Sequence, residues 1–205
     1  MSIASVLALA LACAPAMAAT VFSDNFESGL GQWTGQGSGA TSGQIVLDPL
    51  NPSNQVLNFT AVVIGGDIFS SQPFNVGTAQ TTYLSFDFLG LAVTGGAPQD
   101  SGGFAGYSQG TPDNHHWLAG TELVYVDAGN TQLIDDGTWH HYVIPFTSAF
   151  PTIRVMIEDF AYAGPIAGDA YFDNINVVGV PLPSGAWGGL SLLGGLVAFA
   201  RRSRA

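Results

Sequence analysis

The chain has 205 residues, of which only 9% are charged, against roughly a quarter in ordinary globular proteins. All fifteen of its acidic residues lie between residues 19 and 180, where Arg154 is the only basic residue, and the other three arginines lie within the last five positions. Such a domain repels nucleic acid and anionic membrane surfaces, which are therefore poor partners for it; cations are good partners, and neutral polysaccharides are not excluded.

Residues 1–18 form an apolar stretch that ends in Ala16-Met17-Ala18. Small residues at the third and first positions before a cleavage point are typical of a signal peptide, so we expect signal peptidase to cut after Ala18 and the protein to be exported. The alternatives are a core helix, for which the stretch has no polar face, and lipidation at Cys13, for which ALAC is a poor signal. Cleavage after Ala18 removes the only cysteine, so we expect no disulfide in the mature protein.

The central part of the chain consists of short apolar stretches separated by Gly, Pro, Asn and Asp, which predicts strands and turns. The predicted strands are residues 21–26, 43–48, 55–64, 81–90, 121–129, 138–146, 152–160 and 169–180. Leu84, Phe86 and Phe88 share one face of their strand and alternate with Tyr83, Ser85 and Asp87. Short strands, frequent turns and no helical period favour an all-β fold, an antiparallel β-sandwich over residues 19–179. The segment 90–120 is predicted to be one long irregular loop, and loops of that length are often functional.

Residues 180–205 combine an uncharged apolar stretch with a basic end. Pro181 and Pro183 do not fit inside a helix, so a helix is predicted only after them, over residues 184–200. At about 1.5 Å per residue, the roughly 18 residues from Pro183 to Ala200 span about 27 Å, barely enough to cross a bilayer core. Trp187 suits the outer membrane interface and the arginines suit the cytoplasmic side, which predicts a single transmembrane helix with its amino terminus outside. The alternative is a final helix buried in the core.

The same residues resemble the PEP-CTERM sorting signal in its VPLPA variant. The resemblance rests on Val180, Pro181, Leu182, Pro183, Trp187, Arg201, Arg202 and Arg204. It assigns residues 180–183 to the sorting motif, 184–200 to the membrane helix and 201–205 to the basic tail; Ser184 stands where the variant usually has alanine. The resemblance implies a Gram-negative cell with an exosortase. That enzyme would cut near the motif and pass the domain from the inner membrane, where it faces the periplasm, to the cell surface or the extracellular space. Such proteins often accompany exopolysaccharide production.

The first and last predicted strands resemble those of carbohydrate-binding-module-like jelly rolls. The matching stretches are DNFESGLGQWTG at 24–35 and GDAYFDNINVVG at 168–179. The resemblance implies a jelly roll in which the terminal strands are neighbours, with a structural Ca²⁺ between them whose matching ligands are Asp24, Glu27 and Asp173. Calcium takes six to eight oxygen ligands, which these carboxylates and nearby carbonyls can supply. The alternative is that the three residues are solvated turn residues.

The segment 90–120 supplies the candidate ligand-binding residues. Tyr107, His116 and Trp117 offer rings on which sugars can stack, and Asp113 and Asn114 offer hydrogen bonds, which together predict a site for extracellular polysaccharide. The alternative is that Trp117, together with Phe104, seals the loop onto the sandwich. The histidine pairs 115–116 and 140–141 could bind a transition metal. Neighbours on a strand point to opposite faces, an objection that the pair 115–116 escapes because it lies in the predicted loop. No HExxH or Cys/His spacing is present, which favours exposed polar residues instead.

The sequence gives no support for nucleophilic catalysis by cysteine, because it contains no cysteine after the predicted leader. Acidic pairs at 135–136 and 158–159 are weak signals in so acidic a chain, although Glu158 could be a general acid if it lies in a cleft. We therefore expect a non-catalytic glycan-binding or structural surface protein. The alternative is an extracellular glycosidase or lyase on the same fold.

Overall fold

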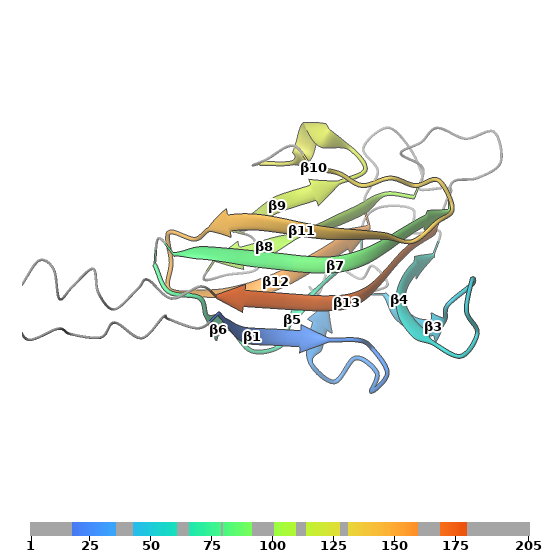
Figure 1. Ribbon diagram of the computed structural model, residues 1–205, viewed down its shortest axis with the longest axis horizontal. Helices are drawn as coiled ribbons and strands as arrows, with labels where there is room; N and C mark the ends of the chain where they lie inside the picture. Colours follow the sequence, from blue (N-terminus) through green and yellow to red (C-terminus); the bar gives the residue numbers. More distant parts are fainter. Residues whose placement is uncertain are drawn as a thin grey trace, which may run out of the picture. The chain divides into compact units, whose positions relative to one another are not determined.

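The chain forms two β-sheets in a computed structural model (Figure 1). The structure describes residues 18–35, 43–60, 66–78, 80–91, 101–109, 114–127, 131–159 and 169–179. The fold described here belongs to a compact unit, Ala19–Gly179. Residues 1–17 of the predicted signal peptide and the whole predicted sorting signal, 180–205, lie outside the described residues. Within the described ranges, no helix is long and apolar enough to cross a membrane.

The first sheet has six strands in the order β11-β7-β13-β4-β3, with β1 also paired to β13. Its strands are β1 (Ala19–Asp24), β3 (Gln44–Leu47), β4 (Gln55–Thr60), β7 (Thr81–Leu91), β11 (His140–Thr147) and β13 (Asp169–Gly179). All of its pairs are antiparallel. The central strand β13 pairs with β4 through residues 169–172 and with β1 through residues 175–179. The terminal strands of the described unit are therefore neighbours, as the jelly-roll resemblance implies.

The second sheet has seven strands in the order β10-β9-β8-β12-β5-β2, with β6 also paired to β12. Its strands are β2 (Trp33–Gly35), β5 (Gly66–Ser70), β6 (Phe74–Asn75), β8 (Gly103–Gln109), β9 (His115–Gly120), β10 (Thr131–Gln132) and β12 (Thr152–Asp159). Every pair is antiparallel except the two-residue pairing of β10 with β9. The predicted all-β sandwich is confirmed for the part of the chain that the structure describes.

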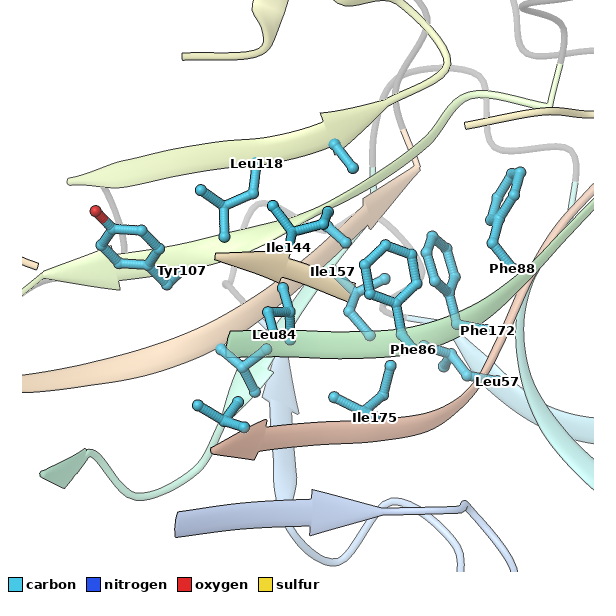
Figure 2. Close-up of a cluster of buried hydrophobic side chains, with 14 of the residues drawn as sticks. Leu57, Leu84, Phe86, Phe88, Tyr107, Leu118, Ile144, Ile157, Phe172 and Ile175 are labelled. Atoms are coloured by element: carbon cyan, nitrogen blue, oxygen red, sulfur yellow. The ribbon is translucent and has the colours of Figure 1, made fainter. Parts of the chain in front are cut away.

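The core lies between the two sheets because alternate residues of the long strands face inward. Leu84, Phe86 and Phe88 of β7 are buried as predicted, and they meet Val155 and Ile157 of β12 in one cluster. Figure 2 shows side chains from both sheets pointing toward one another in this cluster. Since alternate residues of β12 face inward, Arg154, Met156 and Glu158 lie on the outer face of the second sheet.

The prediction of one long loop over 90–120 is wrong, because β8 and β9 lie inside it. Every residue of β8 is buried, so this strand shows no alternation of apolar and polar residues. It also contains Gly103 and Gly106, which suggest a loop in a sequence but allow close packing here. A side chain on Gly106 would come within 2.1 Å of the carbonyl oxygen of His116 on β9.

The prediction of a strand over 121–129 is also wrong. Its residues form a short 3₁₀ turn, η1 (Leu123–Tyr125), closed by hydrogen bonds from Tyr125 N–H to Glu122 and from Val126 N–H to Leu123. The apolar residues that suggested a strand instead place Tyr125 and Val126 against the outer face of the second sheet. The segment therefore covers part of that face.

Candidate functional site

Aromatic side chains gather on the outer face of the second sheet. Phe104 of β8 and Trp117 of β9 point away from the core, because their neighbours Ala105 and Leu118 face it. Their ring centroids are 5.8 Å apart, and Tyr125 meets Phe104 edge-on at 6.3 Å. Phe69, Val126 and Met156 complete this outer cluster. A hydrophobic cluster on the outer face of a sheet indicates that this face packs against other groups rather than only contacting water.

A hollow of about 460 Å³ lies over this cluster. We call it the outer hollow, lined chiefly by Phe104, His115, Trp117, Tyr125, Asp127 and Glu158. Trp117 is 6% exposed and Phe104 is 1% exposed, so these rings form its floor. Tyr125 is half-buried and His115 is exposed, so these are the rings that a ligand can reach. Val124, 80% exposed, adds an apolar rim.

Glu158 brings a carboxyl group with an altered acidity into the outer hollow. Burial, together with charge repulsion from Asp67, its cross-strand partner on β5, raises its pKa to about 7. Near neutral pH, Glu158 is therefore present both as an acid that donates a hydrogen bond and as a carboxylate that accepts one. Sugar hydroxyls can pair with either form.

Arg154 is the only lysine or arginine among the described residues, and it lies on the same outer face. Its guanidinium group is 5.5 Å from the centroid of the Phe69 ring and donates a hydrogen bond to the carbonyl of Ser70. Because these contacts hold the cation in place, Arg154 stabilises the aromatic cluster.

A second hollow, of about 370 Å³, lies on the other side of β9. We call it the edge hollow, lined chiefly by Tyr107, His116, Asp127, Pro145, Phe146 and Thr147. The Tyr107 ring stacks between Phe146, at 4.7 Å, and His116, at 5.1 Å. Burial raises the pKa of Tyr107, whose hydroxyl donates a hydrogen bond to the carbonyl of Thr147 at 3.3 Å.

The structure divides the predicted ligand-binding residues between these two hollows. Tyr107 and His116 face the edge hollow, whereas Trp117 faces the outer hollow, because His116 and Trp117 are consecutive on β9. Asn114 is exposed just before β9 begins, and its side-chain amide donates to the carbonyl of Gln109 at 3.1 Å. Asp113 lies outside the described residues. Phe104 is buried, but as a residue of strand β8 rather than as part of a loop sealed onto the sandwich.

Sequence reasoning missed Tyr125 and Asp127 as site residues. Tyr125 is the last residue of the turn η1 and Asp127 follows it, where the sequence predicted a strand. The apolar alternation of 121–129 signals that the segment packs on something, but it does not distinguish a strand from a turn laid over a sheet. Asp127 carries no signal of its own in so acidic a chain.

The predicted calcium ligands do not converge as a trio. The carboxylate of Asp24 accepts hydrogen bonds from the indole N–H of Trp33 at 2.8 Å and from the N–H of Phe26 at 2.8 Å. Within the ranges that the structure describes, no three acidic, histidine or cysteine side chains form a group that could hold a metal ion. Asp24 thus does not fit a shared site with the other two residues.

The carboxyl groups of Glu27 and Asp173 repel each other, so they fit a cation site better than Asp24 does. Burial raises the pKa of Asp173, and repulsion from Asp87 and Glu27 adds to this, while hydrogen bonds from Asn54 and Asn174 oppose it. Glu27 accepts a hydrogen bond from the N–H of Gln55 at 3.0 Å. Calcium binding between these two carboxylates stays a prediction.

The histidine pairs diverge as strand geometry requires. His115 faces the outer hollow and His116 the edge hollow. Nε2 of His140 lies 2.9 Å from the Asp136 carboxylate, whereas Nδ1 of His141 lies 2.6 Å from that of Asp87. The two histidines of each pair therefore face different surroundings and do not point toward a shared position.

Comparison with protein-family models gives no match, and comparison with curated proteins gives none either. Solved structures do match the fold. The xylan-binding CBM22-1 domain of Paenibacillus barcinonensis Xyn10C is 13% identical, with a TM-score of 0.52 over 82% of this chain and 99% of that domain. The CBM22-1 and GH10 modules of Clostridium thermocellum xylanase 10B, complexed with xylohexaose, are also 13% identical, with a TM-score of 0.52 over 78% of this chain and 28% of that one. The chain has the jelly-roll fold of carbohydrate-binding modules, and the fold expected from the terminal strands is confirmed.

Proposed function

We propose that the domain is a non-catalytic module that binds a neutral extracellular polysaccharide in the outer hollow. The observation that supports this is the reachable pair of rings, His115 and Tyr125, above an aromatic floor and beside the carboxyl groups of Asp127 and Glu158. Rings that stack on the apolar face of a sugar, with a few polar groups for its hydroxyls, are what sugar recognition needs. The xylan-binding neighbours of the fold add support for a β-linked polymer of neutral sugars.

The charge of the domain argues for a neutral ligand. Two carboxyl groups line the outer hollow, and Arg154, the sole lysine or arginine of the described chain, is engaged with Phe69 and Ser70. A polymer rich in uronic acids would meet repulsion that a neutral polymer avoids.

Affinity electrophoresis with soluble xylan, a neutral β-glucan and polygalacturonate tests this function. We expect retardation by a neutral polymer and none by polygalacturonate. Tyr125→Ala should weaken the retardation about tenfold, equivalent to about 1.4 kcal/mol, because it removes a reachable ring. The matched control is Tyr83→Ala, which removes a 37% exposed tyrosine from the outer face of the first sheet. Equal retardation of both variants and the wild type would exclude the outer hollow.

We also propose that the protein is exported and sorted as its terminal segments predict. Signal peptidase removes residues 1–18, the helix at 184–200 holds the protein in the inner membrane, and an exosortase cuts near 180–183. The sequence pattern alone supports this route. Mass spectrometry of protein collected from the native host outside the cell should find neither Cys13 nor Arg204; the presence of both would contradict the route.

One observation favours a second candidate function, glycoside hydrolysis. Glu158 has a pKa of about 7 and faces the outer hollow. Its cross-strand partner Asp67 supplies a second carboxyl group. A raised pKa suits a general acid, and a second carboxylate nearby is the other requirement of glycosidases. A reducing-sugar assay on the bound polymer separates the two functions. Products that disappear in Glu158→Gln support hydrolysis, whereas binding without products supports the non-catalytic module.

A further inference from the structure

Asp127 lines both the outer hollow and the edge hollow. It follows the turn η1, and its backbone N–H donates a hydrogen bond to the carbonyl of Trp117 at 2.9 Å. Its carboxylate lies 3.2 Å from Nδ1 of His116. His116 and Trp117 are consecutive residues of β9 with side chains on opposite faces, so Asp127 spans the point where the two faces meet.

Among the described residues, this part of β9 pairs with a strand on one side only. On one side β9 pairs with β8 through residues 115–120, whereas on the other side β10 pairs only with Ala119 and Gly120. Asp127 meets the strand just before that pairing begins. Half of its side-chain surface is exposed, so it can contact a ligand while it remains paired with His116.

The edge hollow has the same chemistry as the outer hollow. It offers the exposed part of the His116 ring, stacked on Tyr107, together with Pro145 and the hydroxyl group of Thr147. Each hollow alone is at the small end of the range of about 300–1,000 Å³ that ligand sites occupy. A polysaccharide chain is longer than either hollow, and both contain rings beside polar groups.

We propose that the two hollows form one extended site, in which a single neutral oligosaccharide crosses the edge of β9 at Asp127. Sugars at one end of the ligand occupy the outer hollow against Tyr125, and sugars at the other end occupy the edge hollow against His116. The carboxylate of Asp127 accepts hydrogen bonds from hydroxyls of the sugar at the crossing. This inference rests on the proposed glycan-binding function and extends it from one hollow to two.

Calorimetry with xylotriose and xylohexaose tests the extended site. Linking two occupied hollows through one ligand adds affinity without new contacts. We expect a single xylohexaose per chain, bound on the order of a hundredfold more tightly than xylotriose. Two independently bound xylohexaose molecules per chain would overturn the inference, as would equal affinity for the two lengths. Failure of both probes, and of the neutral polymers above, would instead overturn the proposed function itself.

Variants of the two hollows separate their contributions. His116→Ala should remove most of the advantage of xylohexaose over xylotriose and leave the xylotriose affinity within about twofold. Tyr125→Ala should weaken binding of both lengths. The matched control is His141→Ala, which removes the histidine of another histidine–aspartate pair, on the first sheet. An unchanged preference for xylohexaose in a folded His116→Ala variant would exclude the edge hollow, and the wild-type stoichiometry tests the same point without any variant.

Discussion

The indole N–H of Trp33 donates a hydrogen bond of 2.8 Å to the carboxylate of Asp24 and so ties the first strand of one sheet to the first strand of the other. Both residues are buried, and Trp33 packs against Phe26 and Phe22. Asp24→Ala should therefore lower the free energy of unfolding by about 1–3 kcal/mol, because it leaves the buried indole N–H without its acceptor. Denaturant unfolding measures this loss.

The same experiment distinguishes a structural role for Asp24 from a calcium ligand. The loss should be equal with chelator and with calcium, because the partner of Asp24 is an indole rather than an ion. Asn25→Ala, which removes an exposed side chain at the next position, should change the stability little. A loss that disappears in chelator would return Asp24 to the calcium site.

The calcium prediction now depends on Glu27 and Asp173. Calcium should raise the melting temperature of chelator-treated wild-type protein, because a cation would relieve the repulsion that helps raise the pKa of Asp173. Asp173→Asn should abolish this response. A melting temperature that is the same in chelator and in calcium would exclude a calcium ion that stabilises the domain.

Asp159 makes the stability of the domain depend on pH. Its side chain is 0% exposed, and within the described ranges both carboxyl oxygens lack a hydrogen-bond partner. Burial, together with repulsion from Glu158 and Asp169, raises its pKa to about 8. Because the pKa is about 3.9 in the unfolded chain, the folded state keeps a proton that the unfolded state has lost between about pH 4 and pH 8. Stability therefore falls as the pH rises through this window.

Asp159→Asn isolates this effect. The amide stays neutral, so the variant should be more stable than the wild type at pH 8 by on the order of a few kcal/mol, and the advantage should shrink toward pH 4. Glu158 is present in both proteins, so the difference between their melting curves reports on Asp159. A stability difference between the two proteins that does not change between about pH 4 and pH 8 would mean that Asp159 is ionised in the folded state over that whole range.

Gly106 is required for the close approach of β8 and β9. A side chain there would come within 2.1 Å of the carbonyl oxygen of His116, and backbone atoms cannot move aside as a flexible side chain can. Gly106→Ala should lower the stability by about 1–3 kcal/mol or more. Gly31→Ala is the control, because nothing lies within 4 Å of its added carbon. Similar melting temperatures for the two variants would show that the strands can separate without cost.

The alternation of apolar and polar residues predicted the strands that have one face in the core. Leu84, Phe86 and Phe88 alternate with Tyr83 and Ser85, and only the first three face the opposite sheet. The pattern failed where both faces are covered. β8 has apolar packing on one side and the outer cluster on the other, so its sequence contains no polar face to mark it as a strand.

The candidate site was only partly predictable for the same reason. Tyr107, His116 and Trp117 were identified as candidates for stacking, but their division between two hollows follows from strand geometry that a predicted loop does not have. The bulge between β8 and β9 at Ala105 and Gly106 also shifts which residues share a face. Residues such as Asp127 are positioned by backbone contacts between distant segments, and no local pattern encodes those contacts.

The proposed glycan site is tested most directly by amide chemical shifts of the labelled domain titrated with xylohexaose. Concentration-dependent shifts are expected at His115, His116 and Trp117, at Val124 to Asp127, and at Glu158. The amides of Tyr83 and Val143 on the first sheet should not move. Shifts centred on the first sheet, or no shifts where a neutral polymer nevertheless binds, would contradict the proposed site.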